Sequence, residues 1–185
     1  SALIVLVLAI WVVVTPEQTP AWKPGNVLVI TVDTLRSDHL GCYGYEHIKT
    51  PNIDRLAEQG TMFQNAIAQV PLTLPSHVSL FTSTYPQFNN VRDNGIHRLH
   101  QSAITLAERM QESGYATAAF VSAYVLDSKF GLNQGFETYD DETQDQIGEE
   151  MIGHMDAERT ADKVTAAALK WLRGNKDDKR FLWVH

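Results

Sequence analysis

Cysteine is almost absent from this sequence, because Cys42 is the single one in 185 residues. No disulfide can form within the chain, and the simplest role for Cys42 is a small packed thiol beside Gly41 and Tyr43. Clusters of lysine or arginine are also lacking, and 15 basic side chains stand against 22 acidic ones, which gives a formal net charge of −7. This balance argues against nucleic acid as a partner.

Histidines paired at the spacing of a metal site are lacking too. Five histidines are predicted to be ordinary loop or surface residues: His39, His47, His97, His100 and His154. His185 follows the last predicted strand, a plausible place for a ligand, but the sequence assigns it no role.

A long hydrophobic run occurs at the start of the chain, in residues 2–14 (ALIVLVLAIWVVV), and is shorter than the about twenty residues that span a bilayer. Because the chain begins with Ser and not Met, the run can be the end of a longer one. We interpret residues 1–15 as part of a transmembrane helix or signal anchor. A signal-peptide core is less favoured, because no small-residue cleavage site follows the run. A buried strand is also less favoured, because residues 16–25 form a proline-rich linker. The domain 26–185 is then expected outside the cytoplasm, in the periplasm or extracellular space.

Buried strands and amphipathic helices alternate along residues 26–185. Residues 26–33 (NVLVITVD) form a β-branched apolar run, typical of a central strand buried on both faces. Residues 50–60 (TPNIDRLAEQG) predict a helix capped by Thr50, opened by Pro51 and stopped by Gly60.

The same alternation continues downstream. Residues 104–114 predict a helix with a glycine stop, and a buried strand begins at Tyr115. The acidic stretch 131–150 is interpreted as a solvated loop in preference to a cation site at Asp140 and Asp141. Residues 157–173 predict an amphipathic helix closed by Gly174, and residues 180–185 (RFLWVH) a last strand. This order of elements predicts an α/β fold with a mostly parallel sheet.

The segment from Val70 to Asn94 is the most informative for chemistry. Pro71 and Pro75 bracket Thr73, and Pro75 is expected to open a buried helix. Unpaired N–H groups and the positive end of the helix dipole would then surround Thr73, where they favour an oxyanion and ease ionisation of the hydroxyl. The alternative is that Thr73 only caps the helix.

Asp33 ends the first predicted strand. Ligands of open α/β sheets bind beyond the carboxyl ends of the strands, so Asp33 is a candidate metal-binding carboxylate. A cap or turn former for the residues that follow is the alternative, and position alone leaves the two open.

Four ordered motifs together resemble the N-terminal half of a sulfatase-family domain: TVDTLRSDHLGCYGY, TPNIDRLAEQG, TLPSHVSLFTSTYP and GYATAAFVSA. The family belongs to the alkaline phosphatase superfamily of metal-dependent ester hydrolases. The resemblance implies a three-layer αβα sandwich with a mostly parallel central sheet, here C-terminally truncated. It also implies that further Asp, His or Asn metal ligands would lie beyond residue 185.

Classical sulfatases carry a Cys-x-Pro-x-Arg motif whose cysteine or serine becomes formylglycine. The equivalent residues here are Thr73-Leu74-Pro75-Ser76-His77, so the convertible residue and the arginine are both replaced. The resemblance therefore favours superfamily branches that use threonine directly. These are the nucleotide pyrophosphatase/phosphodiesterase-like enzymes, the phosphoethanolamine transferases and the lipoteichoic acid synthases.

The phosphodiesterase-like pattern is T-x-P-x-H, then Y-P, then an asparagine. It is matched by Thr73, Pro75, His77, Tyr85, Pro86 and Asn94. The pattern implies that Thr73 is the nucleophile and shares a metal with Asp33, and that the Asn94 amide donates to a non-bridging oxygen. Without the resemblance, Asn94 would be interpreted as a turn residue. Two glycines of the pattern are replaced, by Ser83 and Asn90, and such glycines often mark positive φ.

These features predict a metal-dependent hydrolase of sulfate or phosphate esters with a threonine nucleophile. One alternative is a membrane-anchored transferase of a phospho head group, and another is a degenerate domain that only binds. The sequence leaves open sulfate against phosphate, the metal (Zn, Ca, Mg or Mn) and the oligomeric state.

Overall fold

The computed structural model describes residues 25–142, 159–176 and 179–185. Its sheet is made of four parallel strands in the order β1-β4-β2-β3. The strands are β1 (Val27–Ile30), β2 (Ala116–Phe120), β3 (Thr138–Asp140) and β4 (Arg180–Val184). The predicted parallel α/β sheet is thereby confirmed.

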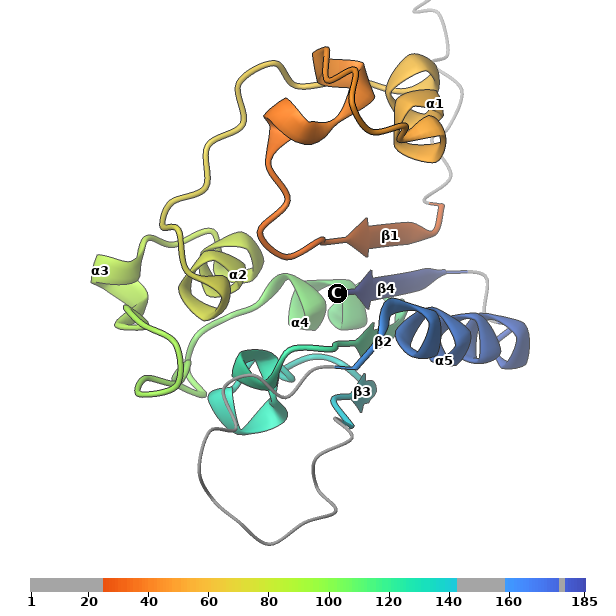
Figure 1. Ribbon diagram of the computed structural model, residues 1–185. Coiled ribbons are helices and arrows are strands. Elements are labelled where there is room, and N and C mark those ends of the chain that lie inside the picture. The colour runs from red at the N-terminus through yellow and green to blue at the C-terminus, as the bar shows by residue number, and fades with distance from the viewer. Residues whose placement is uncertain (1–24, 143–158, 177–178) are drawn as a thin grey trace, which may run out of the picture.

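Helices cover both faces of the sheet (Figure 1). The described helices are α1 (Pro51–Gln59), α2 (Thr73–Thr82), α3 (Pro86–Asn89), α4 (Leu106–Glu112) and α5 (Ala161–Gly174), with short 3-10 turns between them. Of these, α1 lies apart from the sheet and packs on the 3-10 turn at residues 41–43. The larger core joins α2 and α4 to one face, where Phe81 packs on Phe181 and Trp183. A smaller core joins α5 to the other face, around Phe120 and Leu182. These layers are the predicted αβα sandwich.

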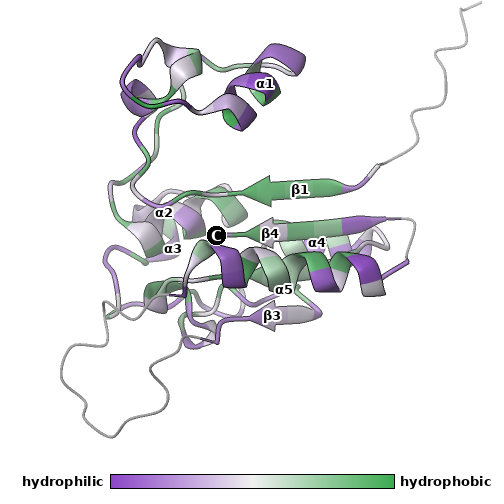
Figure 2. Cartoon of the chain, turned by 45° about the vertical axis from the view of Figure 1, so that its right-hand side comes forward, coloured by the Kyte–Doolittle hydropathy of each residue, from purple (hydrophilic) through white to green (hydrophobic). Residues whose placement is uncertain are grey.

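Strand β1 lies at the edge of the described sheet, next to β4. Val27 and Val29 pack against the larger core, but Leu28 is 56% and Ile30 is 60% exposed. The prediction that this strand is buried on both faces is therefore wrong for the described residues. The smaller core under α5 is built on β2 and β4, so the apolar outer face of β1 stays uncovered (Figure 2).

Other predicted boundaries also differ from the structure. Residues 138–140 were expected to be loop but form β3, because their backbone pairs with Ala118–Phe120 of β2. Helix α5 starts at Ala161, and Gly174 is its last residue and not a stop beyond it. By contrast, α1 begins at Pro51 and ends before Gly60 as predicted.

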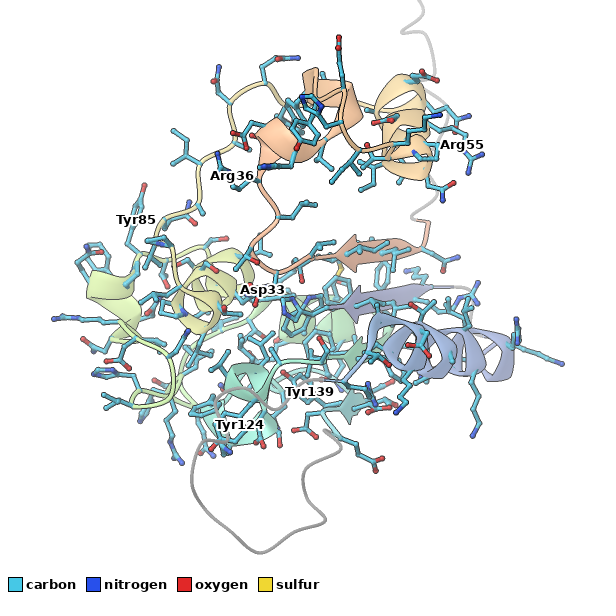
Figure 3. The ribbon with its side chains drawn as sticks, in the orientation of Figure 1. Asp33, Arg36, Arg55, Tyr85, Tyr124 and Tyr139 are labelled. Carbon is cyan, nitrogen blue, oxygen red and sulfur yellow. The ribbon has the colours of Figure 1, made fainter. Side chains whose placement is uncertain are left out.

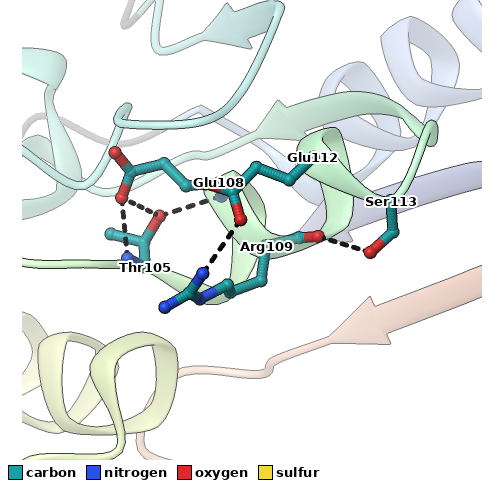
Figure 4. A network of polar contacts seen from close by, with 5 residues as sticks. All are labelled: Thr105, Glu108, Arg109, Glu112 and Ser113. Atoms are coloured by element: carbon teal, nitrogen blue, oxygen red, sulfur yellow. Dashed lines mark hydrogen bonds and ion pairs between the residues drawn. The ribbon is translucent and has the colours of Figure 1, made fainter.

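Helix α4 begins with a reciprocal capping box (Figure 4). Thr105 Oγ1 accepts a hydrogen bond from the Glu108 N–H at 3.1 Å, and the Glu108 carboxylate accepts one from the Thr105 N–H at 2.7 Å. The Thr105 hydroxyl is buried and also lies 2.9 Å from the Gln134 carbonyl oxygen. It therefore ties the start of α4 to the chain that leads into β3.

We expect Thr105→Ala to lower the free energy of unfolding by about 1–3 kcal/mol, because it removes the cap and leaves buried polar groups unpaired. Thr105→Ser keeps the hydroxyl and should cost less than about 1 kcal/mol. Urea unfolding of both variants measures the difference. Equal stability of Thr105→Ala and the wild type would show that the capping box contributes nothing.

The predicted membrane segment 1–15 and residues 16–24 of the linker lie outside the described residues. Among the helices that the structure does describe, none has the length and apolar character needed to cross a bilayer.

Candidate active site

The carboxyl end of β1 and the start of α2 bring two predicted site residues together. Thr73 is the first residue of α2, and its Oγ1 donates a hydrogen bond to Asp33 Oδ1 at 3.3 Å. Figure 3 shows Asp33 in the loop after β1, beside α2. Residues 40 apart in the sequence thus meet at the carboxyl end of β1, where the parallel-sheet rule placed Asp33.

Helix α2 starts two residues earlier than the sequence indicated. Its N-cap is Leu72, no side chain caps it, and Pro75 lies within the first turn. Proline is tolerated there because the first N–H groups of a helix have no intrahelical partner. The interpretation of Thr73 as a mere cap is therefore wrong, since its hydroxyl is turned to Asp33.

The backbone donors expected around Thr73 are largely occupied. The Leu74 N–H donates to Asn94 Oδ1 at 3.0 Å, Pro75 has no N–H, and the Ser76 N–H donates to the Leu72 carbonyl at 3.0 Å. The predicted cradle of free N–H groups is thus wrong for these residues. A ligand at Thr73 has to be bound mainly by side chains.

Asn94 lies beside the nucleophile candidate as the resemblance implied. Because its Oδ1 accepts from the Leu74 N–H, its amide nitrogen is the atom left for a ligand. The side chain is half-buried at the start of α2. Its role as oxyanion donor stays a prediction.

His77 holds the peptide of Thr73 from the next turn of α2. Its Nδ1 lies 2.7 Å from the Thr73 carbonyl oxygen, to which Ser76 Oγ also donates at 3.0 Å. The ring is 8% exposed, and its Nε2 is buried with no hydrogen-bond partner. Burial lowers the pKa of His77, against the opposing effects of the Thr73 carbonyl and Asp33, so the ring stays neutral and donates from Nδ1.

His185, which was left unassigned by the sequence analysis, also lies at this edge. Its ring meets His77 edge to face, with centroids 4.8 Å apart. Its Nδ1 lies 2.8 Å from Thr31 Oγ1, which accepts a hydrogen bond from Trp183 Nε1 at 3.0 Å. The register of the two strands brings His185 to Thr31. Ile30 of β1 pairs with Val184 of β4, so the residues that follow them, Thr31 and His185, lie side by side.

Burial and, next, electrostatic repulsion from the His77 ring when that ring is protonated lower the pKa of His185 from 6.5 to about 4, while Asp33 raises it. Between these values the unfolded chain binds a proton that the folded chain does not, so stability falls as pH falls through this range. We expect a loss of about 2 kcal/mol from about pH 7 to about pH 4. His185→Gln should flatten this slope in unfolding experiments, whereas His100→Gln, at an exposed histidine, should not. An unchanged slope in His185→Gln would contradict the assignment.

The residues present fit part of a metal site. The Asp33 carboxylate and the Thr73 hydroxyl supply two oxygen donors 3.3 Å apart, which suits a divalent cation. Within the described ranges, no group of three or more His, Cys, Asp or Glu side chains could hold a metal ion. Thr34, beside Asp33, adopts φ 51°, a strained conformation for a β-branched residue and one that often accompanies functional sites.

The two glycine replacements leave the local backbone intact. Ser83 ends α2 with φ 55°, and Asn90 ends α3 with φ 63°. Both positions therefore keep the left-handed conformation that glycine adopts most easily.

Comparison with known proteins identifies the family of this chain. The Sulfatase family model matches residues 25–185. Iduronate 2-sulfatase of Mus musculus is 42% identical over 94 residues, which are 50% of this chain and 17% of that protein. The chain thus spans about a sixth of that relative.

Two solved structures share the fold. One, a protein in complex with its substrate D-glucosamine-2-N,6-O-disulfate, is 24% identical with a TM-score of 0.71, covering 88% of this chain and 34% of that one. The other, the phosphonate monoester hydrolase of Agrobacterium radiobacter, is 23% identical with a TM-score of 0.68. The match covers 86% of this chain and 40% of that one. At these identities the likeness shows the fold alone. The family model, which covers most of the chain, shows that the chain belongs to the sulfatase family.

Proposed function

We propose that the full-length protein is a metal-dependent hydrolase of sulfate or phosphate esters that uses Thr73 as its nucleophile. The observation that carries this proposal is the contact of the Thr73 hydroxyl with the Asp33 carboxylate at the first residue of α2. The sulfatase relative supports a sulfate ester as substrate.

In the proposed reaction, Thr73 Oγ forms a bond to sulfur or phosphorus as the bond to the ester oxygen breaks and the alcohol leaves. Asp33 Oδ1 accepts the hydroxyl proton of Thr73, as its hydrogen bond indicates. The Asn94 amide donates to a non-bridging oxygen, and His77 holds the Thr73 peptide. A bound divalent cation, held by Asp33 and Thr73, would lower the pKa of the hydroxyl and neutralise charge on the transferred group. Water then cleaves the threonine ester.

The test is turnover of p-nitrophenyl sulfate, a phosphate monoester and a phosphate diester by the full-length protein. The protein is first stripped of metal and then reloaded with Zn²⁺, Ca²⁺, Mg²⁺ or Mn²⁺ in turn. We expect one ester class to be cleaved only after reloading, with water as the acceptor. A labelled lipid or glycan product would instead identify the transferase, and silence on all esters and acceptors would favour the binding domain.

The same proposal places the catalytic domain outside the cytoplasm, anchored through residues 1–15. It is supported by the apolar run at residues 2–14. Protease added to intact cells should reach the domain, and carbonate washing should leave it in the membrane fraction. Protection from protease or release by carbonate would contradict this part.

A further inference from the structure

The start of α2 offers a tetrahedral anion few backbone donors. Leu74 and Ser76 already donate their N–H groups within the protein, and Pro75 has none. An oxyanion that developed at Thr73 would therefore depend on side-chain donors pointing toward it. Asn94 is one such donor. Its amide group cannot donate hydrogen bonds to all three non-bridging oxygens of a sulfate ester.

His185 is positioned to be another donor. It follows β4, at the same edge of the sheet as Asp33, and its backbone N–H is tied to the Phe120 carbonyl at 3.0 Å. The charge of Asp33 reaches the ring, and both residues line one cavity of about 360 Å³. His185 and Asp33 therefore line the same hollow at the carboxyl edge of the sheet, together with residues of α5, although Thr73 and Asn94 are not among its lining residues.

The hydrogen bonds around His185 allow a tautomer with its proton on Nε2. Trp183 Nε1 is a donor only, so Thr31 Oγ1 accepts from it. The contact of Thr31 Oγ1 with His185 Nδ1 runs in either direction, because the oxygen can accept a second hydrogen bond or donate its own proton. With Nδ1 as acceptor, the neutral ring carries its proton on Nε2.

The Nε2 atom of His185 is also open to a ligand. It has no hydrogen-bond partner among the described residues, and it is not fully buried, whereas Nε2 of His77 is. It is therefore accessible, unlike that of its neighbour. Burial keeps the pKa of His185 near 4, so the ring is neutral at neutral pH.

We propose that His185 is a further catalytic residue whose Nε2–H donates a hydrogen bond to an oxygen of the ester's tetrahedral group, with Thr31 and Trp183 as positioning residues. This inference rests on the proposed function, because it needs the ester to lie at Thr73. No bond is formed or broken by His185, and its proton stays on Nε2.

Binding of inorganic sulfate and phosphate to the full-length, metal-loaded protein tests the proposal without relying on turnover. Titration calorimetry should show Kd raised about 5- to 20-fold in His185→Phe, the loss of one hydrogen bond to a charged group. His185→Gln places an amide N–H near the Nε2 position and should recover Kd to within about 3-fold of the wild type. Melting temperature checks that each variant is folded, and Thr31→Val provides a second variant with an expected loss of binding if His185→Phe does not fold.

Thr31 provides the readout that a merely structural role would not give. Thr31→Val keeps the shape but removes the hydroxyl, so the ring tautomer is no longer fixed and Kd should rise about 2- to 5-fold. Thr31→Ser keeps the hydroxyl and should restore binding. In nitrogen NMR spectra, the wild type and Thr31→Ser should show the Nε2–H tautomer of His185, and Thr31→Val a mixture.

The outcomes separate this inference from the proposed function. Equal Kd for the wild type, His185→Phe and His185→Gln, or an Nδ1–H tautomer in the wild type, would overturn the inference even if Thr73-dependent turnover is found. Anion binding that depends on His185, in a protein that cleaves no ester, would support the contact while rejecting the hydrolase.

Discussion

Thr73→Ala is expected to lower kcat/KM of the full-length protein for its ester by about 10³-fold or more, because it removes the hydroxyl proposed to form the covalent intermediate. The fold should be retained, since the Thr73 hydroxyl makes a single hydrogen bond, to exposed Asp33, and does not cap α2. Steady-state kinetics and a melting curve measure the two effects separately.

Two further variants make this result interpretable. Thr73→Ser keeps a hydroxyl at the start of α2 and should retain a measurable part of the activity. Thr61→Ala changes an exposed threonine away from the site and should match the wild type. Near wild-type turnover by Thr73→Ala would show that Thr73 is not the nucleophile.

Asp33→Asn is expected to weaken divalent metal binding by about 10²-fold or more and to lower turnover at least as much. The amide keeps the shape of the side chain but removes the charge that holds the cation and the acceptor for the Thr73 proton. Titration calorimetry with each of the four candidate ions measures affinity, and kinetics at saturating metal measures the remaining catalytic loss.

Asp38→Asn is the matched control. Asp38 lies in the same loop but forms an exposed ion pair with Arg36 at 2.6 Å, and Arg36 lowers the pKa of its carboxyl. It should bind metal as the wild type does. If the two variants were alike in metal affinity, Asp33 would not be a metal ligand.

The sequence predicted those elements whose signals are local. Pro51 and Gly60 mark α1, and the apolar runs of β2 and β4 lie within the buried sheet. The features that the sequence did not predict depend on packing against neighbouring elements of the fold. The composition of β1 is that of a central strand, but Leu28 and Ile30 are exposed because the smaller core under α5 involves β2 and β4. Strand β3 has three residues, too few for a pattern.

The candidate site was predictable to a similar extent. The strand-end rule placed Asp33 at the carboxyl edge of the sheet, the predicted helix start singled out Thr73, and the resemblance joined these two residues and added Asn94. The free N–H groups at α2 were not found, because Asn94 itself occupies one of them. The arrangement of His185 was beyond the sequence, since it depends on the parallel register of β1 and β4 and on one hydroxyl, that of Thr31.

The most direct test of the central claim is mass spectrometry of the full-length, metal-loaded protein quenched in acid during turnover. The account predicts that the peptide containing Thr73 gains the mass of one sulfo or phospho group, that fragmentation places it on Thr73, and that Thr73→Ala lacks it. Turnover with no adduct on Thr73 at any quench time, or an adduct on another residue, would contradict the account.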